Sequence, residues 1–435
     1  MSFPSPAELT VENLGPCSFP SPLRGRQTFA AVDDGVLLPA TSAEARSCHE
    51  LDPAAQALPF FEPAGARRNL FFDPARIACG IVSCGGLCPG INNVIRALTL
   101  TLTWGYGVER IYGFRYGYAG VAGDPAAGPP LLLTKEEVEP IHRWGGSMLG
   151  SSRGPQSPAR MVDQLLALGV KVLFAIGGDG TLRGVSALAD EIRARQAGIA
   201  VVGLPKTIDN DIAWIDRSFG FATAVEAART AIDGAHAEAA GALNGIGLVK
   251  LMGRHSGFIA AHASLATSDV NFCLVPEVPF QLEGFLYALE QRLRSRRHAV
   301  VVVAEGAAQD LLREASTREE RDRSGNLKLG DVGLFLKEKI LAHLGAHGLE
   351  ATLKYIDPSY IIRSVPANAF DAEYCLMLGQ HAAHAGLAGR TNMVVGYWNG
   401  LFTHVPVAVT VAQRKKLDPH VWQRVLEATG QPAEM

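Results

Sequence analysis

A lysine and two carboxylates stand close together in the segment PKTIDND (205–211), as Lys206, Asp209 and Asp211. The segment directly follows the apolar run AVVGL (200–204), so these polar groups are expected where a buried strand ends. A carboxylate at such a place can take the proton of a hydroxyl group, beside phosphates that the lysine attracts. Burying these groups without a function would be costly. The segment therefore predicts a general base next to a phosphate-binding site.

The segment GGDGT (177–181) follows a second apolar run, VLFAI (172–176). Its glycines would let phosphate groups approach the backbone, while Asp179 offers a carboxylate that can bind Mg²⁺. Thr181 is placed to cap the helix that is expected to follow. The same motif occurs in NAD kinases and diacylglycerol kinases, and a purely structural loop is the alternative interpretation.

A third glycine-rich segment is SCGGLCPG (83–90), in which two glycines turn the chain after the apolar run IACGIV (77–82). Pro89 is expected near the first position of a helix. Amide groups at the start of that helix would bind an anion, although a tight strand-to-helix turn without a ligand explains the segment equally well.

Two common motifs are absent or out of context. The chain has no GxxxxGK[ST] phosphate-binding loop. It has one match to the GxSxG pattern of hydrolases, at 150–154, but that pattern needs an apolar strand before it and a helix after it. HRWGGSML precedes the match and PQSP follows it, so the sequence does not predict a hydrolase.

The apolar runs continue along the chain, and helical patterns separate them. IGLVKL (246–251) and AVVVVA (299–304) are further predicted strands, and 181–196 and 223–240 are predicted helices. Continuous apolar runs are typical of buried parallel strands, and their alternation with helices predicts an α/β fold. Ligands bind at the carboxyl ends of such strands, where the polar segments lie.

Residues 1–75 differ from the rest because they are rich in proline, alanine and serine and show little periodicity. We expect an N-terminal extension that packs on the body, with one short strand in 28–38. The first residues have neither the basic nor the apolar segment of a secretory signal. The charged segment 313–326 is expected to be an exposed connection.

Composition limits the classes of protein to which the chain can belong. Its 435 residues predict two or three folded units, and 48% apolar residues allow a large core. A net charge of −3 gives no general attraction to nucleic acid or anionic membranes, and no run is apolar enough to span a bilayer. Seven scattered cysteines indicate reduced thiols and a cytoplasmic protein.

PKTIDND together with GGDGT resembles the phosphofructokinase family. The similarity continues through IDRSFGFATAVEAA (215–228), NGIGLVKLMGRHSGF (244–258), VVAEGAAQD (302–310) and YIDPSYIIRSVPANAFD (355–371). It extends from about residue 77 to about residue 404 and is greatest with the long branch that includes plant and trypanosomatid enzymes. The resemblance implies two Rossmann-like lobes with mostly parallel sheets. Residues 76–218 and 363–410 would form a phosphate-donor lobe, and 219–362 and 411–435 a fructose 6-phosphate lobe.

The resemblance also implies an activity: with Mg²⁺, such an enzyme transfers a phosphoryl group to the 1-hydroxyl group of fructose 6-phosphate. Asp209 is implied to take the hydroxyl proton and Asp179 to bind Mg²⁺, while Arg254 and Thr207 complete the catalytic set. The implied ATP-binding residues are Gly85, Arg153, Gly178, Asp179, Gly180 and Thr181. The implied sugar phosphate-binding residues are Thr207, Ile208, Asp209, Met252, Gly253, Arg254, Glu305, Tyr360, Ile361, Ile362 and Arg363.

The chemistry of three of these side chains agrees with the implied roles. Arg254 can offset charge on the transferred group, and Arg363 has the forked geometry that suits the 6-phosphate. Glu305 can accept hydrogen bonds from sugar hydroxyls, although a strand-end carboxylate with a local partner is the alternative.

Two positions bear on the phosphate donor, which is ATP or pyrophosphate in this family. Users of pyrophosphate usually carry aspartate where Gly180 stands and lysine where Lys206 stands. Gly180 leaves space for the α-phosphate of ATP, whereas Lys206 follows the pyrophosphate pattern, and plant-like and trypanosomatid ATP enzymes share this pair. We therefore expect ATP as the donor, with pyrophosphate as the alternative.

Family members are usually homodimers or homotetramers, so the resemblance implies a homo-oligomer that acts on ATP and fructose 6-phosphate, without nucleic acid or membrane. An NAD or lipid kinase would account for GGDGT but not for PKTIDND. A catalytically silent subunit that senses sugar phosphates is a different class of function, which the presence of Asp179 and Asp209 disfavours.

Overall fold

The computed structural model describes residues 3–23, 25, 28–31, 34–51, 58–314 and 329–435. Most of the charged segment 313–326, expected to be an exposed connection, lies outside these residues. The chain divides into two compact units. Unit 1 comprises Met1–Ile208, Ile212–Gly220 and Val365–Arg414, and unit 2 comprises Asp209–Asp211, Phe221–Ser364 and Lys415–Met435. The functional lobes implied by the resemblance stay a prediction, because a lobe is defined by the ligand that it binds.

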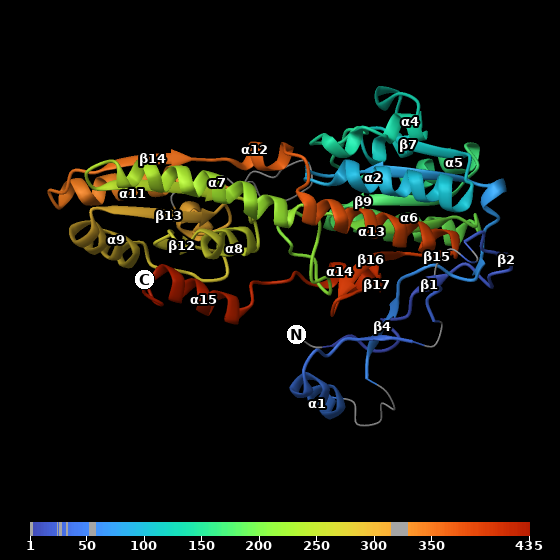
Figure 1. Ribbon diagram of the computed structural model, residues 1–435, viewed down its shortest axis with the longest axis horizontal. Coiled ribbons are helices and arrows are strands. Elements are labelled where there is room, and N and C mark those ends of the chain that lie inside the picture. Colours follow the sequence, from blue (N-terminus) through green and yellow to red (C-terminus); the bar gives the residue numbers. More distant parts are fainter. Residues whose placement is uncertain (1–2, 24, 26–27, 32–33, 52–57, 315–328) are drawn as a thin grey trace. The chain divides into compact units, whose positions relative to one another are not determined.

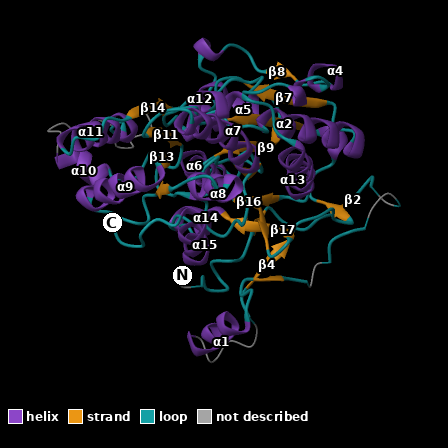
Figure 2. Ribbon diagram, turned by 60° about the vertical axis from the view of Figure 1, so that its left-hand side comes forward, coloured by secondary structure: helices purple, strands orange, loops and turns teal. Residues whose placement is uncertain are grey.

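Unit 1 is built on a nine-stranded sheet whose centre is parallel. In order, its strands are β3 (Val36–Leu37), β4 (Phe60–Pro63), β17 (Leu401–Pro406), β16 (Met393–Trp398), β10 (Ala200–Pro205), β9 (Val170–Gly177), β6 (Ala78–Ser83), β7 (Arg110–Phe114) and β8 (Leu131–Leu132). From β16 to β7 the strands run parallel, and the outer strands pair antiparallel. Figure 2 shows β16, β17 and β4 side by side. The three runs predicted in this part of the chain form β6, β9 and β10.

Helices cover both faces of this sheet. They include α2 (Ile91–Leu100), α5 (Pro158–Ala167), α6 (Asp179–Ala194) and α13 (Ala369–Leu387). On one face, Leu173 of β9 joins the apolar cluster formed by α5 and α6. On the other face, α13 lies beside α2 (Figure 1), and an added Cβ at Gly386 would lie 2.5 Å from Val172. Neighbouring strand residues therefore face opposite helix layers, which explains why the run is apolar throughout.

Unit 2 is built on a four-stranded parallel sheet. Its order is β12 (Phe272–Leu274), β13 (His298–Ala304), β11 (Gly245–Leu251) and β14 (Thr352–Ile356). Helices of this unit include α7 (Phe221–Ala240), α8 (Phe258–Thr267), α9 (Leu282–Arg296), α10 (Gln309–Glu314), α11 (Val332–Ala346), α12 (Ser359–Ser364) and α15 (Pro419–Thr429). Ile246 and Leu248 pack against α9 and α11, whereas Gly247 faces α7, where an added Cβ would lie 2.7 Å from the carbonyl oxygen of Ala235. Both units are thus layered α/β structures, and the predicted fold class is confirmed.

The length of α7, 20 residues, raises the question of a membrane segment. The helix carries Glu226, Arg229 and Asp233, which a membrane interior would not accommodate. Across the described parts of the chain, no helix combines the length and apolar character needed to cross a membrane.

The first residues attach to unit 1 mainly through short strands. β1 (Glu12–Asn13) pairs with β15 (Arg390–Thr391), and β2 (Phe19–Pro20) pairs with β5 (Asn69–Leu70). Within the described part of 28–38, the predicted strand is limited to β3. β4 is the longest of these N-terminal strands and joins the large sheet through β17.

Glu62 on β4 is the centre of a buried charge cluster. Its Oε1 accepts hydrogen bonds from Arg67 at 2.6 Å and from Arg390 at 2.9 Å, and His404 Nδ1 lies 3.4 Å away. Burial alone would raise the pKa of Glu62, but hydrogen bonding to His404 and the surrounding positive charge lower it to about 2. Because burial lowers the pKa of His404, the two arginines carry the positive charge at neutral pH.

We expect Glu62→Gln to destabilise unit 1 by about 3–5 kcal/mol at pH 7, because it leaves Arg67 buried without its anionic partner. A carboxyl group with a lowered pKa stabilises the fold above its unfolded value of 4.5, and this contribution is lost as the pH falls towards 2. The difference between variant and wild type in urea denaturation should therefore shrink over that range. Glu109→Gln, at an exposed position, is the control. Equal stabilities at pH 7 would contradict the cluster's role.

Candidate active site

The turn after β6 gathers two cationic side chains against glycine backbone in unit 1. Gly85 has a φ of +86°, and its N–H donates to the carbonyl oxygen of Ser152 at 3.0 Å. The buried Lys206, which follows β10, donates through Nζ to the carbonyl oxygen of Gly86 at 2.6 Å. An added Cβ at Gly86 would lie 3.5 Å from Arg153. Bare backbone next to two cations is an arrangement suited to phosphate groups.

Helix α2 begins at Ile91, directly after the glycine-rich segment. Its N-cap residue is Gly90, with a φ of 99°, so Pro89 precedes the helix instead of occupying its first position. An added Cβ at Gly90 would lie 2.7 Å from Cys375 and 3.0 Å from Phe219. Pro89 thus lies near the start of the helix, as predicted, and packing against α13 requires glycine at the turn between them.

Ser151 and Ser152 belong to a loop that holds Gly85 in place. The hydroxyl group of Ser151 donates to the carbonyl oxygen of Gly85 at 2.6 Å, and that of Ser152 donates to the carbonyl oxygen of Tyr116 at 2.6 Å. Residues 144–157 form neither helix nor strand. The GxSxG match therefore lacks the strand–turn–helix context of a nucleophilic serine.

The GGDGT segment joins β9 to α6. An added Cβ at Gly177 would lie 2.0 Å from Oγ1 of Thr181, so this turn requires glycine. Gly178 is the N-cap residue, and the N–H of Thr181 donates to its carbonyl oxygen at 2.8 Å. The prediction that Thr181 caps the helix is wrong, because α6 begins at Asp179 and Thr181 lies within its first turn.

Asp179 and Gly180 give this turn its chemical character. The carboxylate of Asp179 stands at the positive end of α6, and its Oδ2 lies 2.7 Å from Nη2 of Arg414. Carboxylate oxygens are ligands that a hard divalent cation such as Mg²⁺ prefers, so the donor type at Asp179 fits that ion, with Arg414 as a competing cation. Gly180 is exposed, and an added Cβ there would meet nothing within 4 Å.

In unit 2, two parallel strands end side by side at polar residues. Glu305 follows β13, and its N–H donates to the carbonyl oxygen of Leu251 at the end of β11 at 2.8 Å. The N–H of Gly306 donates to the carbonyl oxygen of Gly253 at 3.0 Å, and an added Cβ at Gly306 would lie 2.0 Å from the carbonyl oxygen of Arg254. This sheet edge thus presents an arginine next to a glutamate on tightly packed backbone.

Asp209 belongs to the same group of charges. Ser256 donates to its carbonyl oxygen at 3.3 Å. Burial, together with the negative charges of Asp211 and Glu305, raises the pKa of Asp209 to about 7, although the positive charge of Arg363 opposes them. Two further carboxylates and an arginine are therefore close enough to affect the ionisation of Asp209. A carboxyl group with a pKa near 7 is suited to general-base catalysis at neutral pH.

Helix α12 presents its four expected site residues in different ways. Nε of Arg363 donates to Sδ of Met252 at 3.2 Å, which places the guanidinium group beside the end of β11. Ile362 is fully buried, whereas 83% of Tyr360 and 69% of Ile361 are exposed. Arg363 is thus the member of this run that the structure joins to the Asp209 group.

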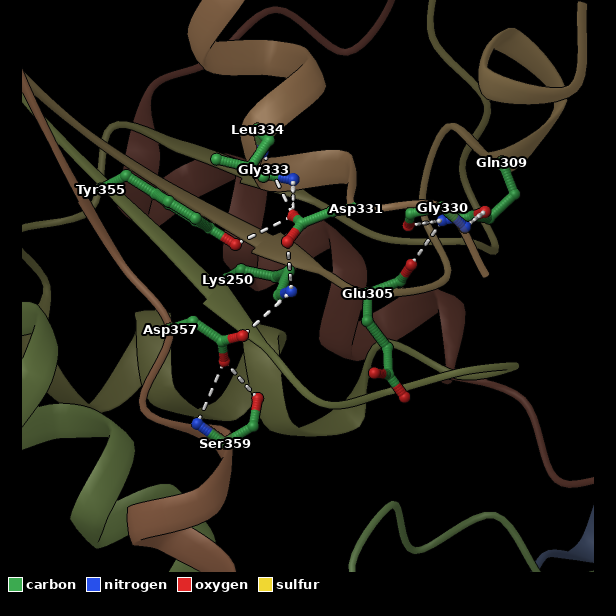
Figure 3. Close-up of polar contacts among 10 residues, drawn as sticks. All are labelled: Lys250, Glu305, Gln309, Gly330, Asp331, Gly333, Leu334, Tyr355, Asp357 and Ser359. Carbon is green, nitrogen blue, oxygen red and sulfur yellow. Dashed lines mark hydrogen bonds and ion pairs between the residues drawn. The ribbon is translucent and has the colours of Figure 1, made fainter. Parts of the chain in front are cut away.

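Lys250 lies inside the apolar run that forms β11, and the sequence did not predict a role for it. Its Nζ lies 3.0 Å from Asp357 and 3.2 Å from Asp331 (Figure 3). Asp357 also accepts from the N–H of Ser359 at the start of α12, and Asp331 accepts from the hydroxyl group of Tyr355 and caps α11. Burial alone would lower the pKa of Lys250, but its hydrogen bonds to Asp357 and Tyr355 raise it. This charged lysine joins the end of β11 to the start of α12. A lysine within an apolar strand was the one signal that could have revealed it.

The backbone at Glu305 is held from its other side by Gln309. Nε2 of Gln309 donates to the carbonyl oxygen of Glu305 at 2.7 Å, and the N–H of Gly330 donates to Oε1 of Gln309 at 3.0 Å. In Figure 3 the carboxylate of Glu305 points away from these contacts. The amide side chain therefore fixes the residue and leaves its carboxylate available for other partners.

The structure therefore sorts the predicted site residues into two groups. One turn of unit 1, after β6, brings together Gly85, Arg153 and Lys206. The turn after β9 contains Asp179 and Gly180. Thr207 and Ile208 also belong to unit 1, where Ser218 donates to the carbonyl oxygen of Thr207 and the side chain of Ile208 is buried. Asp209, Arg254, Glu305 and Arg363 form the group in unit 2.

Known proteins resemble this chain in sequence over most of its length. The family model for phosphofructokinase matches residues 78–386. The ATP-dependent 6-phosphofructokinase of Amycolatopsis methanolica is 49% identical, over 98% of this chain and 95% of that protein. The enzyme of the same name from Trypanosoma brucei brucei is 42% identical, over 97% and 87% of the two chains. This chain belongs to the phosphofructokinase family.

Solved structures agree on the fold. A crystal structure of the pyrophosphate-dependent phosphofructokinase from Marinobacter aquaeolei has a TM-score of 0.66 to this chain, with 21% sequence identity. The match covers 79% of this chain and 86% of that one. At such low identity, the likeness concerns the fold alone.

Asp209→Asn should stabilise the protein above neutral pH. Because the pKa of Asp209 is raised from 3.8 to about 7, stability that is present below pH 3.8 is lost as the pH rises through 7. The full shift corresponds to about 4 kcal/mol, and since Asp209 keeps some exposure we expect about 2 kcal/mol at pH 8.5. Urea denaturation at pH 8.5 and pH 4 should show the gain at the higher pH only. Asp233→Asn, on the surface of α7, is the control, and no gain at pH 8.5 would contradict the raised pKa.

Proposed function

We propose that this protein is an ATP-dependent 6-phosphofructokinase, which transfers the γ-phosphoryl group of ATP to the 1-hydroxyl group of fructose 6-phosphate in glycolysis. The observation that carries the proposal is Asp209, a carboxyl group whose pKa is raised to about 7 beside Glu305 and Arg363. The names of relatives that are 41–49% identical support ATP as the donor. The product would be fructose 1,6-bisphosphate.

Asp209 acts in this proposal as the general base for the sugar hydroxyl group. With a pKa near 7, it is ionised just above neutral pH and still basic enough to accept a proton. The charges of Asp211 and Glu305 raise that basicity, and Glu305 can also accept hydrogen bonds from sugar hydroxyls. Arg363 offers two parallel donors to the 6-phosphate, and Arg254 offsets charge on the transferred group.

The remaining proposed roles follow the two units. In unit 1, Gly85, Arg153 and the segment 178–181 hold the phosphates of ATP, and Thr207 and Ile208 contribute to the sugar site. Asp179 would bind Mg²⁺, which when bound neutralises charge on the donor phosphates. In unit 2, the further sugar contacts are Met252, Gly253, Tyr360, Ile361 and Ile362.

Open space at Gly180 supports ATP, because a longer donor needs room beyond its two outer phosphates. One observation favours pyrophosphate as a second candidate: the buried ammonium group of Lys206 stands against the turn at Gly85 and Gly86. Phosphorylation of fructose 6-phosphate, measured with each donor at fixed Mg²⁺, separates the two. We expect a higher kcat/KM with ATP, and a preference for pyrophosphate would overturn the proposed donor.

The family also supports a proposal for the oligomeric state and the cellular location of the enzyme. We propose a homodimer or homotetramer in the cytoplasm. Sedimentation of the purified protein tests the assembly, and a monomer would contradict it.

Asp209→Asn should lower kcat by about 10²–10⁴, because an amide cannot take the hydroxyl proton, and should change the KM for fructose 6-phosphate much less. In the wild type, kcat/KM for fructose 6-phosphate should rise with pH through about 7 as Asp209 of the free enzyme ionises. Steady-state kinetics with a coupled assay measures both. Asp233→Asn should behave like wild type. A nearly unchanged kcat in Asp209→Asn would rule out the general-base assignment.

Gly180→Asp should fold normally, since the new side chain meets open space and an aspartate suits the first turn of a helix. It should nevertheless lose ATP activity, because a like charge about 4 Å from the α-phosphate costs on the order of 4 kcal/mol, or roughly a thousandfold. The measurement is kcat/KM for ATP and for pyrophosphate. Gly180→Ala adds a Cβ without charge and should lose far less. Retained ATP activity in the aspartate variant would show that this space does not serve the donor.

A further inference from the structure

Arg414 is the cationic partner of the proposed metal ligand, and the fold delivers it there from a distant part of the sequence. It follows α14 (Val407–Ala412), which packs on α6 and is tied to it by a hydrogen bond from Arg183 to the carbonyl oxygen of Val411 at 3.1 Å. From this position, Nη2 of Arg414 lies 2.7 Å from Oδ2 of Asp179. Both side chains keep some exposure, 34% for Arg414 and 22% for Asp179.

The backbone of Arg414 is fixed independently of that ion pair. Arg414 forms an antiparallel bridge with Ile212, and the next N–H, of Lys415, donates to the carbonyl oxygen of Asp211 at 3.0 Å. This short ladder attaches Arg414 to the chain just beyond the proposed base. A long side chain on a fixed backbone can exchange one anionic partner for another nearby without any movement of the main chain.

Charge explains why such an exchange matters. With Arg414 on its carboxylate, Asp179 is already neutralised, and a bare divalent cation has to displace the guanidinium group before it can bind. A cation that arrives with a phosphate donor brings new anionic oxygens, and guanidinium groups bind phosphate through paired charge-assisted hydrogen bonds. The donor's phosphates therefore replace the carboxylate of Asp179 as the anionic partner of Arg414 when the cation binds that carboxylate.

We propose that Arg414 is a donor-binding residue that makes metal binding at Asp179 conditional on the phosphate donor. In the free protein it occupies the carboxylate, and in the complex it binds the donor's phosphates. The inference rests on the proposed function in one respect, namely that Asp179 is the metal ligand. It goes further in giving the site a means of rejecting a metal ion that arrives alone.

The test is a comparison of metal binding without a donor and donor binding with metal. Mn²⁺ is the probe, because it shares the preference of Mg²⁺ for carboxylate and water and its binding can be followed by electron paramagnetic resonance. In Arg414→Gln, we expect the affinity for Mn²⁺ alone to increase on the order of tenfold, while the KM for Mg–ATP rises by at least a similar factor. Arg414→Lys should fall between the variant and the wild type.

Arg183→Gln is the matched control, since it removes an arginine from the same contact between α6 and α14 without touching Asp179. It should leave both quantities unchanged. If Arg414 only braces the fold, its loss would weaken Mn²⁺ and Mg–ATP binding together, or neither, and either result overturns the proposal.

A second variant separates this inference from the roles on which it rests. Asp179→Asn should abolish the Mn²⁺ binding in both the wild-type and the Arg414→Gln background. If it does not, Asp179 is not the ligand, and the metal assignment and the inference fall together. If Asp179→Asn weakens Mn²⁺ but Arg414→Gln has no effect, the inference alone is wrong. Failure of the proposed reaction would appear instead as a wild type that does not phosphorylate fructose 6-phosphate, a measurement independent of the Mn²⁺ titration.

Discussion

Strand β10 ends at Pro205, and the next six residues have to serve both units. Lys206 is held in unit 1, where its N–H donates to the carbonyl oxygen of Gly177 at 3.0 Å and its side chain donates to that of Gly86. Three residues later, Asp209 belongs to unit 2. Because neighbouring Cα atoms are about 3.8 Å apart, those of Lys206 and Asp209 cannot be separated by more than roughly 11 Å. The covalent chain therefore keeps the lysine ammonium group close in sequence to the proposed base, whatever arrangement the two units adopt.

Two charge clusters in unit 2 show how structural and functional polar groups differ. Lys250 lies between Asp331 and Asp357, and each partner shifts the pKa of the other towards its charged form. That cluster is stable as it stands, and it positions β11 relative to α12. Around Asp209, by contrast, burial and the negative charges of Asp211 and Glu305 outweigh the positive charge of Arg363, and the pKa of the carboxyl group rises. At neutral pH and above, Asp209 carries a negative charge that the fold does not favour. Such a carboxylate readily accepts a proton or a cationic ligand, and its charge lowers the stability of the fold.

Much of this arrangement could be predicted from the sequence, because local rules govern it. The runs 172–176 and 200–204 became β9 and β10 within two residues, since a strand buried on both faces has to be apolar throughout. Glycine motifs marked the turns where backbone approaches backbone, as at Gly177. Helix starts were less certain: the sequence does not reveal how closely α13 packs on Gly90.

Contacts between distant parts of the chain were the features that the sequence could not supply. Arg414 reaches Asp179 only because α14 packs on α6, and no local pattern marks that arginine. In the sequence, Lys250 is only an interruption of an apolar strand. Its ion pairs with Asp331 and Asp357 exist only in the folded chain. The N-terminal strands are too short to produce a periodic signal, and the charge cluster around Glu62 forms only when β4 meets β17.

The glycines of the site sharpen the distinction between what the fold needs and what a ligand needs. Gly177 and Gly306 are required by the fold, because an added Cβ would lie 2.0 Å from a neighbouring atom in each case. Gly180 is not, since a Cβ there would meet open space, and a glycine in a helix costs up to about 1 kcal/mol relative to alanine. Open space alone is not diagnostic, because Gly234 in the middle of α7 is equally unhindered. Gly180 differs in its place: it stands in the first turn of α6, directly after Asp179 and at the positive end of the helix dipole. At that place a missing side chain leaves amide groups accessible to an anion, which is what the proposed donor site at Gly180 requires and what folding alone does not.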